Sequence, residues 1–227
     1  ESNGGKWVRY DENGHMVKGW DVNENGTYYF DQITGAMAKG ALLLDDVQYG
    51  FDPIMGTMLD CQWLHTEVGD YWYEGGIRQG TEGRGKEIYD LDSDAWYWLD
   101  ADQGGAKAVN KDVYQESNGG KWVRYDANGH MIKGWDTNDD GTYYFDLITG
   151  AMAKGDIVVD NLPCSFDTNT GIGCNLMWHS MDGKDYWYEA GKRQGYDPNN
   201  AAYRGKEIYD PASGAWYWLC LLYTSPS

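Results

Sequence analysis

The sequence is poor in aliphatic residues and in positive charge. Leu, Ile, Val and Phe together supply 36 of its 227 residues, and Asp and Glu outnumber Lys and Arg by 36 to 18. A composition so short of aliphatics and so acidic is typical of disordered chains. The acidic balance also disfavours nucleic acid and anionic membrane surfaces as partners, because both are bound through clustered Lys and Arg. The apolar runs, such as Ala41–Leu44, are too short for membrane insertion.

Cysteine and catalytic motifs are equally sparse. The four Cys show no spacing typical of a zinc site. Cys164 and Cys174 flank one turn, so a disulfide between them is conceivable but not required. The sequence contains no GxSxG, no HExxH and no plausible Cys/His pair. These absences favour a protein that is not an enzyme within these residues and that uses no cofactor.

Aromatic residues compensate for the missing aliphatics. The chain has 12 Trp and 19 Tyr, and each such side chain can bury roughly 150–250 Å². Every Trp in the first half has a partner in the second, namely Trp7/Trp122, Trp20/Trp135, Trp63/Trp178, Trp72/Trp187, Trp96/Trp216 and Trp98/Trp218. Disordered linkers do not keep aromatic residues in register in this way. We therefore expect an ordered chain with an aromatic core.

An internal repeat explains this register. Residues 1–40 recur at 116–155 with six differences, and the match extends to Tyr71/Tyr186. Five extra residues within Tyr196–Tyr203 then shift the offset from 115 to 120. The repeat predicts two array units, 1–115 and 116–219. The last eight residues, 220–227, break the pattern and resemble a translated sequencing adapter, so we interpret them as a non-native tail.

A finer rhythm of about 20 residues runs through each unit. Short aromatic segments alternate with Asn/Asp/Gly turns, for example Trp7–Tyr10 before Asp11–Gly14, and Tyr28–Asp31 before Gln32–Gly35. This alternation is typical of β-hairpins, and no helical apolar stripe is present. The sequence predicts an all-β fold, a β-hairpin solenoid of stacked aromatic repeats with about five hairpins per unit.

Two stretches, 21–26 and 136–141, match the opening D-x-N-x-[DN]-G of a calcium loop. The twelfth position, which should be Glu, is Gln32 in one stretch and Leu147 in the other. We therefore expect hairpin turns here and predict no metal site.

The tandem pattern is similar to the cell-wall-binding, or choline-binding, repeat family, which includes glucan-binding regions. One match is Gly19-Trp20, Gly26–Asp31, Gly35-Ala36-Met37 and Gly40, and a second runs in tandem from Gly5 to Trp20. The resemblance implies a β-hairpin solenoid on a secreted, surface-attached bacterial protein. It also implies a non-catalytic role in binding a cell-wall polymer, either choline-bearing teichoic acid or a glycan.

The resemblance also implies where the ligand binds. In choline-binding members, aromatic residues of consecutive hairpins surround a quaternary ammonium and a Met lines the site. The corresponding residues of this chain are Trp7, Met16, Trp20 and Tyr29 in one unit, and Trp122, Met131, Trp135 and Tyr144 in the other. Thr27 and Thr142 stand where the family has Trp, which favours sugar binding or a purely structural role at those hairpins.

Two alternatives stay open beside the binding module. One is a structural spacer or adhesin stalk in which the aromatic rings only pack. The other is the binding part of a peptidoglycan hydrolase whose catalytic domain lies outside this sequence. The sequence predicts that Trp20 and Trp135 lie at junctions between hairpins, beside Trp7 and Trp122, with part of a ring face open. Fully buried rings would favour the stalk.

Overall fold

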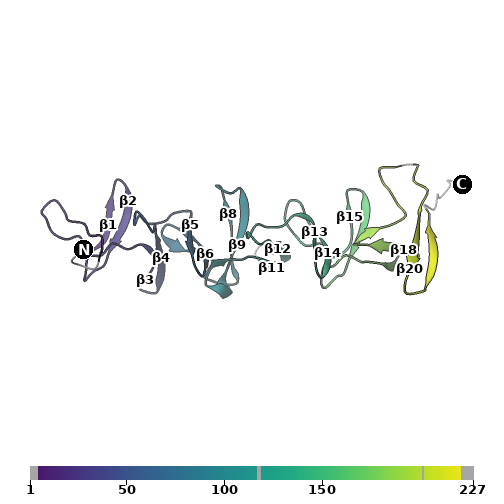
Figure 1. The fold of residues 1–227 in the computed structure, drawn as a ribbon, viewed down its shortest axis with the longest axis horizontal. Coiled ribbons are helices and arrows are strands. Elements are labelled where there is room, and N and C mark those ends of the chain that lie inside the picture. The colour runs from purple at the N-terminus through teal and green to yellow at the C-terminus, as the bar shows by residue number, and fades with distance from the viewer. Residues whose placement is uncertain (1–4, 117–118, 201, 221–227) are drawn as a thin grey trace. The chain divides into compact units, whose positions relative to one another are not determined.

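The fold is all-β. A computed structural model describes residues 5–116, 119–200 and 202–220 (Figure 1), and within these ranges the only helix is the three-residue 3-10 turn η1 (Ala101–Gln103). None of the described residues form a helix that is long and apolar enough to cross a membrane. The predicted fold class, built of stacked hairpins without long helices, is confirmed. The tail from Leu221 to Ser227 lies outside the described residues.

The hairpins of the first copy follow one another along the chain. The paired strands are β1 (Gly19–Asn23) with β2 (Gly26–Phe30), β3 (Gly40–Leu44) with β4 (Val47–Phe51), β5 (Gln62–Thr66) with β6 (Gly69–Glu74), and β8 (Gly85–Asp90) with β9 (Ala95–Asp100). The short strands β7 (Ile77–Arg78) and β10 (Ala106–Lys107) join several of these hairpins into one sheet, in the order β3-β4-β7-β6-β10-β9-β8 with β5 on β6.

The second copy repeats this element order. Its strands are β13 (Gly134–Asn138), β14 (Gly141–Phe145), β15 (Gly155–Val159), β16 (Leu162–Phe166), β17 (Met177–Met181), β18 (Lys184–Glu189), β19 (Lys192–Arg193), β20 (Lys206–Asp210) and β21 (Ala215–Leu219). The hairpin of β11 (Lys111–Gln115) and β12 (Lys121–Tyr125) spans the boundary between the two copies in sequence. The five-residue insertion falls between β19 and β20, in a segment whose described residues form no strand.

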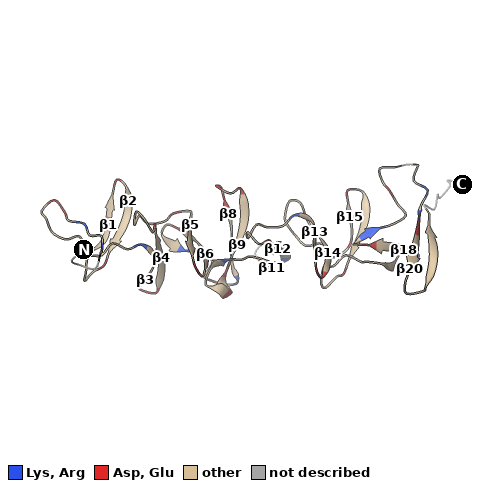
Figure 2. Cartoon of the chain, in the orientation of Figure 1, with Lys and Arg blue, Asp and Glu red and all other residues tan. Residues whose placement is uncertain are grey.

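The chain forms two compact units. One comprises 1–111 with 125–130, and the other comprises 112–124 with 131–227. Figure 2 shows acidic residues spread over many of the hairpins of both units. Each unit is described below by itself.

The expected turns at 21–26 and 136–141 are present, but the strands that the first of them joins differ from the pairing that the aromatic rhythm suggests. The sequence pairs Tyr28–Asp31 with Ala36–Lys39, but in the structure β2 pairs along its whole length with the preceding strand β1. The expected pairing survives as a single bridge between Phe30 and Met37. The reason is local: the side-chain oxygen of Asn23 accepts a hydrogen bond from the Asn25 N–H and so closes a tight two-residue turn.

Backbone hydrogen bonds join each hairpin to the one before it. The N–H of Met37 donates to the carbonyl of Trp7 at 2.8 Å, and the N–H of Met58 donates to the carbonyl of Thr27 at 2.7 Å. The second copy repeats both bonds, from Met152 to Trp122 and from Gly173 to Thr142, each at 2.7 Å. The return segment of each hairpin therefore docks on the first aromatic strand of its predecessor.

A methionine lies beneath the turn glycine of the next hairpin. The Met37 sulfur occupies the space that a Cβ on Gly56 would need, and Met152 stands in the same relation to Gly171. Both glycines have positive φ, +73° and +76°. Any other residue at these two positions would have an unfavourable φ, and its Cβ would also overlap the methionine sulfur.

Gly56→Ala should therefore destabilise the array more than a glycine substitution at an open turn. Gly14 has a similar φ of +79°, and no atom lies within 4 Å of the place that a Cβ would take there, so Gly14→Ala should cost only the left-handed strain, about 1–2 kcal/mol. Gly56→Ala should cost about 1–3 kcal/mol more. Urea unfolding of both variants measures the difference, and equal losses would contradict the packing role of Met37.

Arginines pack on aromatic rings where aliphatic residues are missing, Arg124 buried and Arg9 half-buried. The Arg124 guanidinium lies 4.0 Å from the centre of the Tyr143 ring. It donates to both carboxylate oxygens of Asp112 at 2.6 and 2.9 Å, and to Asp136 at 2.8 Å. In the first copy, Arg9 stacks on Tyr28 at 4.2 Å and pairs with Asp21. Asp21 and Asp136, the first residues of the calcium-like stretches, are thus arginine partners.

Aspartates close the turns that follow the aromatic strands. The carboxylate of Asp31 accepts hydrogen bonds from the backbone N–H and the hydroxyl of Thr34, both at 2.7 Å. Asp146 and Asp167 repeat this arrangement with their own threonines. The N–H of the threonine, more than its hydroxyl, holds the pKa of each of the three carboxyls below the ordinary value of 3.8.

These turns should make the fold sensitive to acid. Because the three pKa values are lower in the folded state, the unfolded chain binds more protons, and the stabilisation is present above about pH 4 and is lost as pH falls through the folded values. The variant Asp31→Asn, Asp146→Asn, Asp167→Asn keeps an acceptor oxygen that does not titrate. Its melting temperature should fall less steeply than that of the wild type below about pH 4, and parallel curves would contradict the assignment.

Candidate functional site: aromatic cages

Trp20 is the centre of a three-ring cage formed by two consecutive hairpins. Its ring centre lies 5.1 Å from that of Tyr29 on β2 and 5.0 Å from that of Tyr49 on β4, with interplanar angles of 67° and 66°. Phe51 lies behind it at 6.1 Å. Tyr29 is 9% exposed whereas Trp20 is 46% exposed. The tyrosine walls are therefore held by the hairpins while the central ring keeps an open face.

The same geometry recurs further along the first copy. Trp63 on β5 contacts Trp72 on β6 at 5.1 Å and 67°, and Tyr97 on β9 at 5.1 Å and 73°. The indole N–H of Trp63 donates to Asp90 at 3.1 Å, which fixes the orientation of the central ring. Trp63 is half-buried, and its two partners are buried.

The second copy contains the equivalent of this cage. Trp178 contacts Trp187 at 5.3 Å and 70°, and Tyr217 at 5.1 Å and 78°. Its indole N–H donates to Asp210 at 3.2 Å. The three rings line a pocket of about 320 Å³ together with Asp185 and other residues. Edge-to-face contacts are a favourable arrangement of aromatic rings. Trp187 is fully buried and Tyr217 is exposed, so Tyr217 and the half-buried Trp178 are the rings that a ligand can reach.

Trp135, the counterpart of Trp20, has an incomplete cage. Tyr144 contacts it at 5.1 Å and 61°, and Phe166 lies at 5.9 Å. Cys164 stands at the position equivalent to Tyr49, so the third ring is missing. The ammonium of Lys192 instead lies 4.2 Å from the centre of the Trp135 ring.

The structure brings some of the predicted site residues into contact and keeps others apart. Trp20 with Tyr29, and Trp135 with Tyr144, are brought together as edge-to-face pairs. Within the described residues, Trp7 makes no ring contact with Trp20: it is 67% exposed and lies near the Lys39 ammonium, 5.5 Å from its ring centre.

The predicted neighbourhood of Trp135 differs in the same way. Trp122 pairs with Tyr114 of its own hairpin at 5.4 Å and not with Trp135. Both predicted methionines are half-buried and pack beneath turn glycines, Met16 under Gly35 and Met131 under Gly150.

Several cage residues were not predicted from the sequence. The third wall of the Trp20 cage and the two cages further along involve Tyr49, Trp63, Trp72, Tyr97, Trp178, Trp187 and Tyr217. Apart from Tyr97 and Tyr217, these residues lie in hairpins that match the repeat motif poorly. The available signal was the triplet Tyr-Trp-Tyr at 71–73 and 186–188, which pairs with Trp63 and Trp178 across each hairpin.

Comparison with known proteins identifies the repeat. The family described as "Choline-binding repeat" matches residues 2–63. Residues 2–63 are thus similar to choline-binding repeats. The match includes the Trp20 cage with both of its tyrosine walls and extends to Trp63.

Solved structures with the same fold extend over most of the chain. CbpJ from Streptococcus pneumoniae TIGR4 aligns with a TM-score of 0.63 at 22% identity, covering 83% of this chain and 70% of that one. The modular autolysin LytC from Streptococcus pneumoniae aligns with a TM-score of 0.56 at 24% identity, covering 84% and 43%. At these identities the likeness concerns the fold alone, and it extends over hairpins that lie outside residues 2–63.

A curated relative is much longer than this chain. Glucosyltransferase-S from Streptococcus downei is 29% identical over 195 residues, covering 79% of this chain and 14% of that protein. The chain thus spans about a seventh of that enzyme. Choline-binding repeats are binding modules, and the proteins similar to this chain include enzymes.

Proposed function

We propose that this chain is a non-catalytic module that retains a secreted bacterial protein at the cell wall by binding choline. The observation that carries the proposal is the Trp20 cage, in which three rings on two hairpins surround an exposed indole face. Residues 1–115 and 116–219 are its two array units, and the polymer it recognises is a choline-bearing teichoic acid.

The chemistry of the cage suits a quaternary ammonium. Such a cation has no N–H to satisfy, so it loses little when it leaves water and gains attraction from each aromatic face within about 6 Å. Among the described residues, no Lys or Arg takes part in a cation–π contact with Trp20, Tyr29 or Tyr49. The formal net charge of −18 further favours a cationic ligand over an anionic one.

The pocket at Trp178 is the second proposed choline site. Its central indole contacts Trp187 and Tyr217 with nearly the geometry of the Trp20 cage. Asp185 lines the pocket and supplies a negative charge, although Lys184 and Arg193 also lie on its wall. We therefore expect this site to bind choline as well, with an affinity set by the balance of these charges.

A glycan is the second candidate ligand, and the likeness to Glucosyltransferase-S favours it. A different part of the second copy would suit a sugar. Trp135 opens onto a pocket lined by polar side chains of the insertion, Asp197 and Asn199, and by Tyr196 and Tyr203. An aromatic platform beside hydrogen-bonding groups is the usual environment of a small polar ligand.

Choline titration of the purified chain tests the proposal. Isothermal calorimetry should detect binding in about the millimolar range, equivalent to about −4 kcal/mol per site. Trp20→Ala should remove one site, because the central ring touches both other walls. Trp96→Ala is the matched control, since Trp96 is 41% exposed and pairs only with Tyr89 among the described rings.

Retention on purified cell walls extends the test to the polymer. The double variant Trp20→Ala, Trp178→Ala should lose retention while circular dichroism still reports a folded chain, and free choline should elute the wild type. Elution by a soluble glucan and not by choline would establish the glycan reading. Loss of folding in the double variant, with no ligand effect in the wild type, would favour the structural stalk.

A further inference from the structure

Lys107 occupies the Trp63 cage from within the chain. It lies on β10, which inserts between β6 and β9. Its ammonium is 5.5 Å from the ring centre of Trp63 and 5.7 Å from that of Tyr97. The Lys107 side chain is only 18% exposed. The cation therefore sits against two of the three cage rings, largely away from water.

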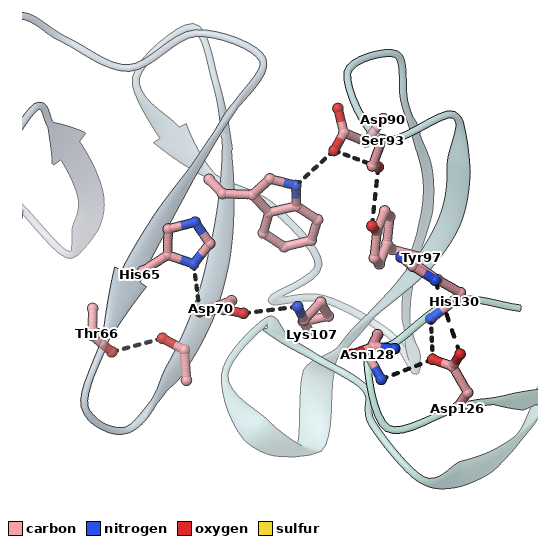
Figure 3. Close-up of polar contacts among 12 residues, drawn as sticks. His65, Thr66, Asp70, Asp90, Ser93, Tyr97, Lys107, Asp126, Asn128 and His130 are labelled. Atoms are coloured by element: carbon pink, nitrogen blue, oxygen red, sulfur yellow. Dashed lines mark hydrogen bonds and ion pairs between the residues drawn. The ribbon is translucent and has the colours of Figure 1, made fainter.

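A carboxylate holds this ammonium in position. Lys107 forms an ion pair with Asp70 at 2.8 Å, and Asp70 also contacts the His65 imidazole at 2.7 Å (Figure 3). Burial would raise the pKa of Asp70, but the hydrogen bonds from Lys107 and His65 lower it on balance. Figure 3 shows Lys107 between Asp70 and Tyr97, and the His130 ring packs on Tyr97 at 5.3 Å.

The equivalent cage of the second copy is a pocket. Trp178, Trp187 and Tyr217 reproduce the three rings, and Asp185 stands at the position of Asp70. No cation–π contact within the described residues involves Trp178. About 320 Å³ of space lies beside these rings, and Cys220 is among the residues that line it. The positions that would correspond to β10 fall in the 220–227 tail, so the comparison concerns the whole strand that carries Lys107 and not the lysine alone.

A lysine also distinguishes the Trp20 cage from its counterpart at Trp135, and here the lysine belongs to the second copy. Cys164 pairs with Lys192 across β16 and β19, at the positions where the first copy pairs Tyr49 with Ile77. The exchange removes one ring and supplies an ammonium at 4.2 Å from Trp135. The Trp20 cage, with Ile77 at this position, has no such contact among the described residues.

Not every lysine near an indole has this arrangement. Lys39 lies 5.5 Å from Trp7 and Lys154 lies 5.8 Å from Trp122, but each donates to a turn carbonyl, at 2.7 and 2.6 Å. Neither tryptophan is the centre of a three-ring cage. These lysines close turns, so they serve as controls for the two that fill cages.

We propose that Lys107 and Lys192 are built-in cation ligands, which occupy the ring faces of Trp63 and Trp135 that an external quaternary ammonium would use and leave the Trp20 cage for such a ligand. The identity of the external ligand rests on the proposed function, whereas the positions of the Lys107 and Lys192 ammonium groups at Trp63 and Trp135 do not.

Removing either lysine should create a new site for a small quaternary cation. The probe is tetramethylammonium chloride, with sodium chloride at equal ionic strength as reference. Lys192→Ile is the sharpest variant, because the first copy carries Ile77 at this position in a folded hairpin. Lys107→Met keeps most of the apolar stem and removes the charge. Lys39→Met is the control.

Calorimetry and thermal unfolding give independent readouts. Lys107→Met should melt at a lower temperature than the wild type and recover at least half of that loss in saturating tetramethylammonium. Lys107→Met should also bind one more equivalent than the wild type, and Lys192→Ile should gain binding at least about tenfold tighter than any wild-type site at Trp135, equivalent to about 1.4 kcal/mol. Lys39→Met should show neither effect.

The two proposals fail in different ways. If the wild type binds no choline but both lysine variants gain tetramethylammonium binding, the proposed function is wrong and the built-in ligands stand. If the wild type binds choline and the variants gain nothing, by calorimetry and by melting temperature, the built-in ligands are overturned. A Lys107→Met chain that does not fold leaves the decision to Lys192→Ile.

Discussion

The packing of aromatic rings across the junction between consecutive hairpins is the interaction on which the rest of the structure depends. A chain with so few aliphatic residues cannot bury a conventional core, and a lone hairpin is marginal in water. Each central tryptophan therefore contacts a ring on its own hairpin and a second on the next one, as Trp20 does with Tyr29 and Tyr49. The backbone bonds from Met37 and Met58 fix the spacing of the hairpins, and the rings set their orientation.

The same arrangement of rings can stabilise the fold and bind a cation. A cage needs a cation to complete it, and that cation can come from solution or from the chain. Where Lys107 supplies it, the ammonium also pairs with Asp70 and ties β10 to β6. Arg124 and Arg9 show the same preference for charge on aromatic faces within the core. Cation–π contacts thus replace part of the aliphatic packing that the composition lacks.

Sequence reasoning recovered what depends on local pattern. The repeat, its change of offset, the all-β class and the pairs Trp20–Tyr29 and Trp135–Tyr144 follow from the repeat and from short motifs. The third ring and the internal cation could not be predicted, because the contacts of Tyr49 with Trp20 and of Lys107 with Trp63 depend on how separate hairpins pack. The partner of β2 was predicted wrongly. The aromatic pattern marks β2 but does not show which neighbouring segment pairs with it, and the turn closed by Asn23 selects the preceding one.

The distribution of cages within the 115-residue period has a consequence for multivalent attachment. A single cage in the millimolar range holds a polymer only briefly, but a second cage on the same chain engages the same polymer at a high effective concentration. Because Cys164 and Lys192 replace Tyr49 and Ile77 in the second copy, the number of cages open to such a polymer would depend on single-residue differences between copies as well as on the number of copies.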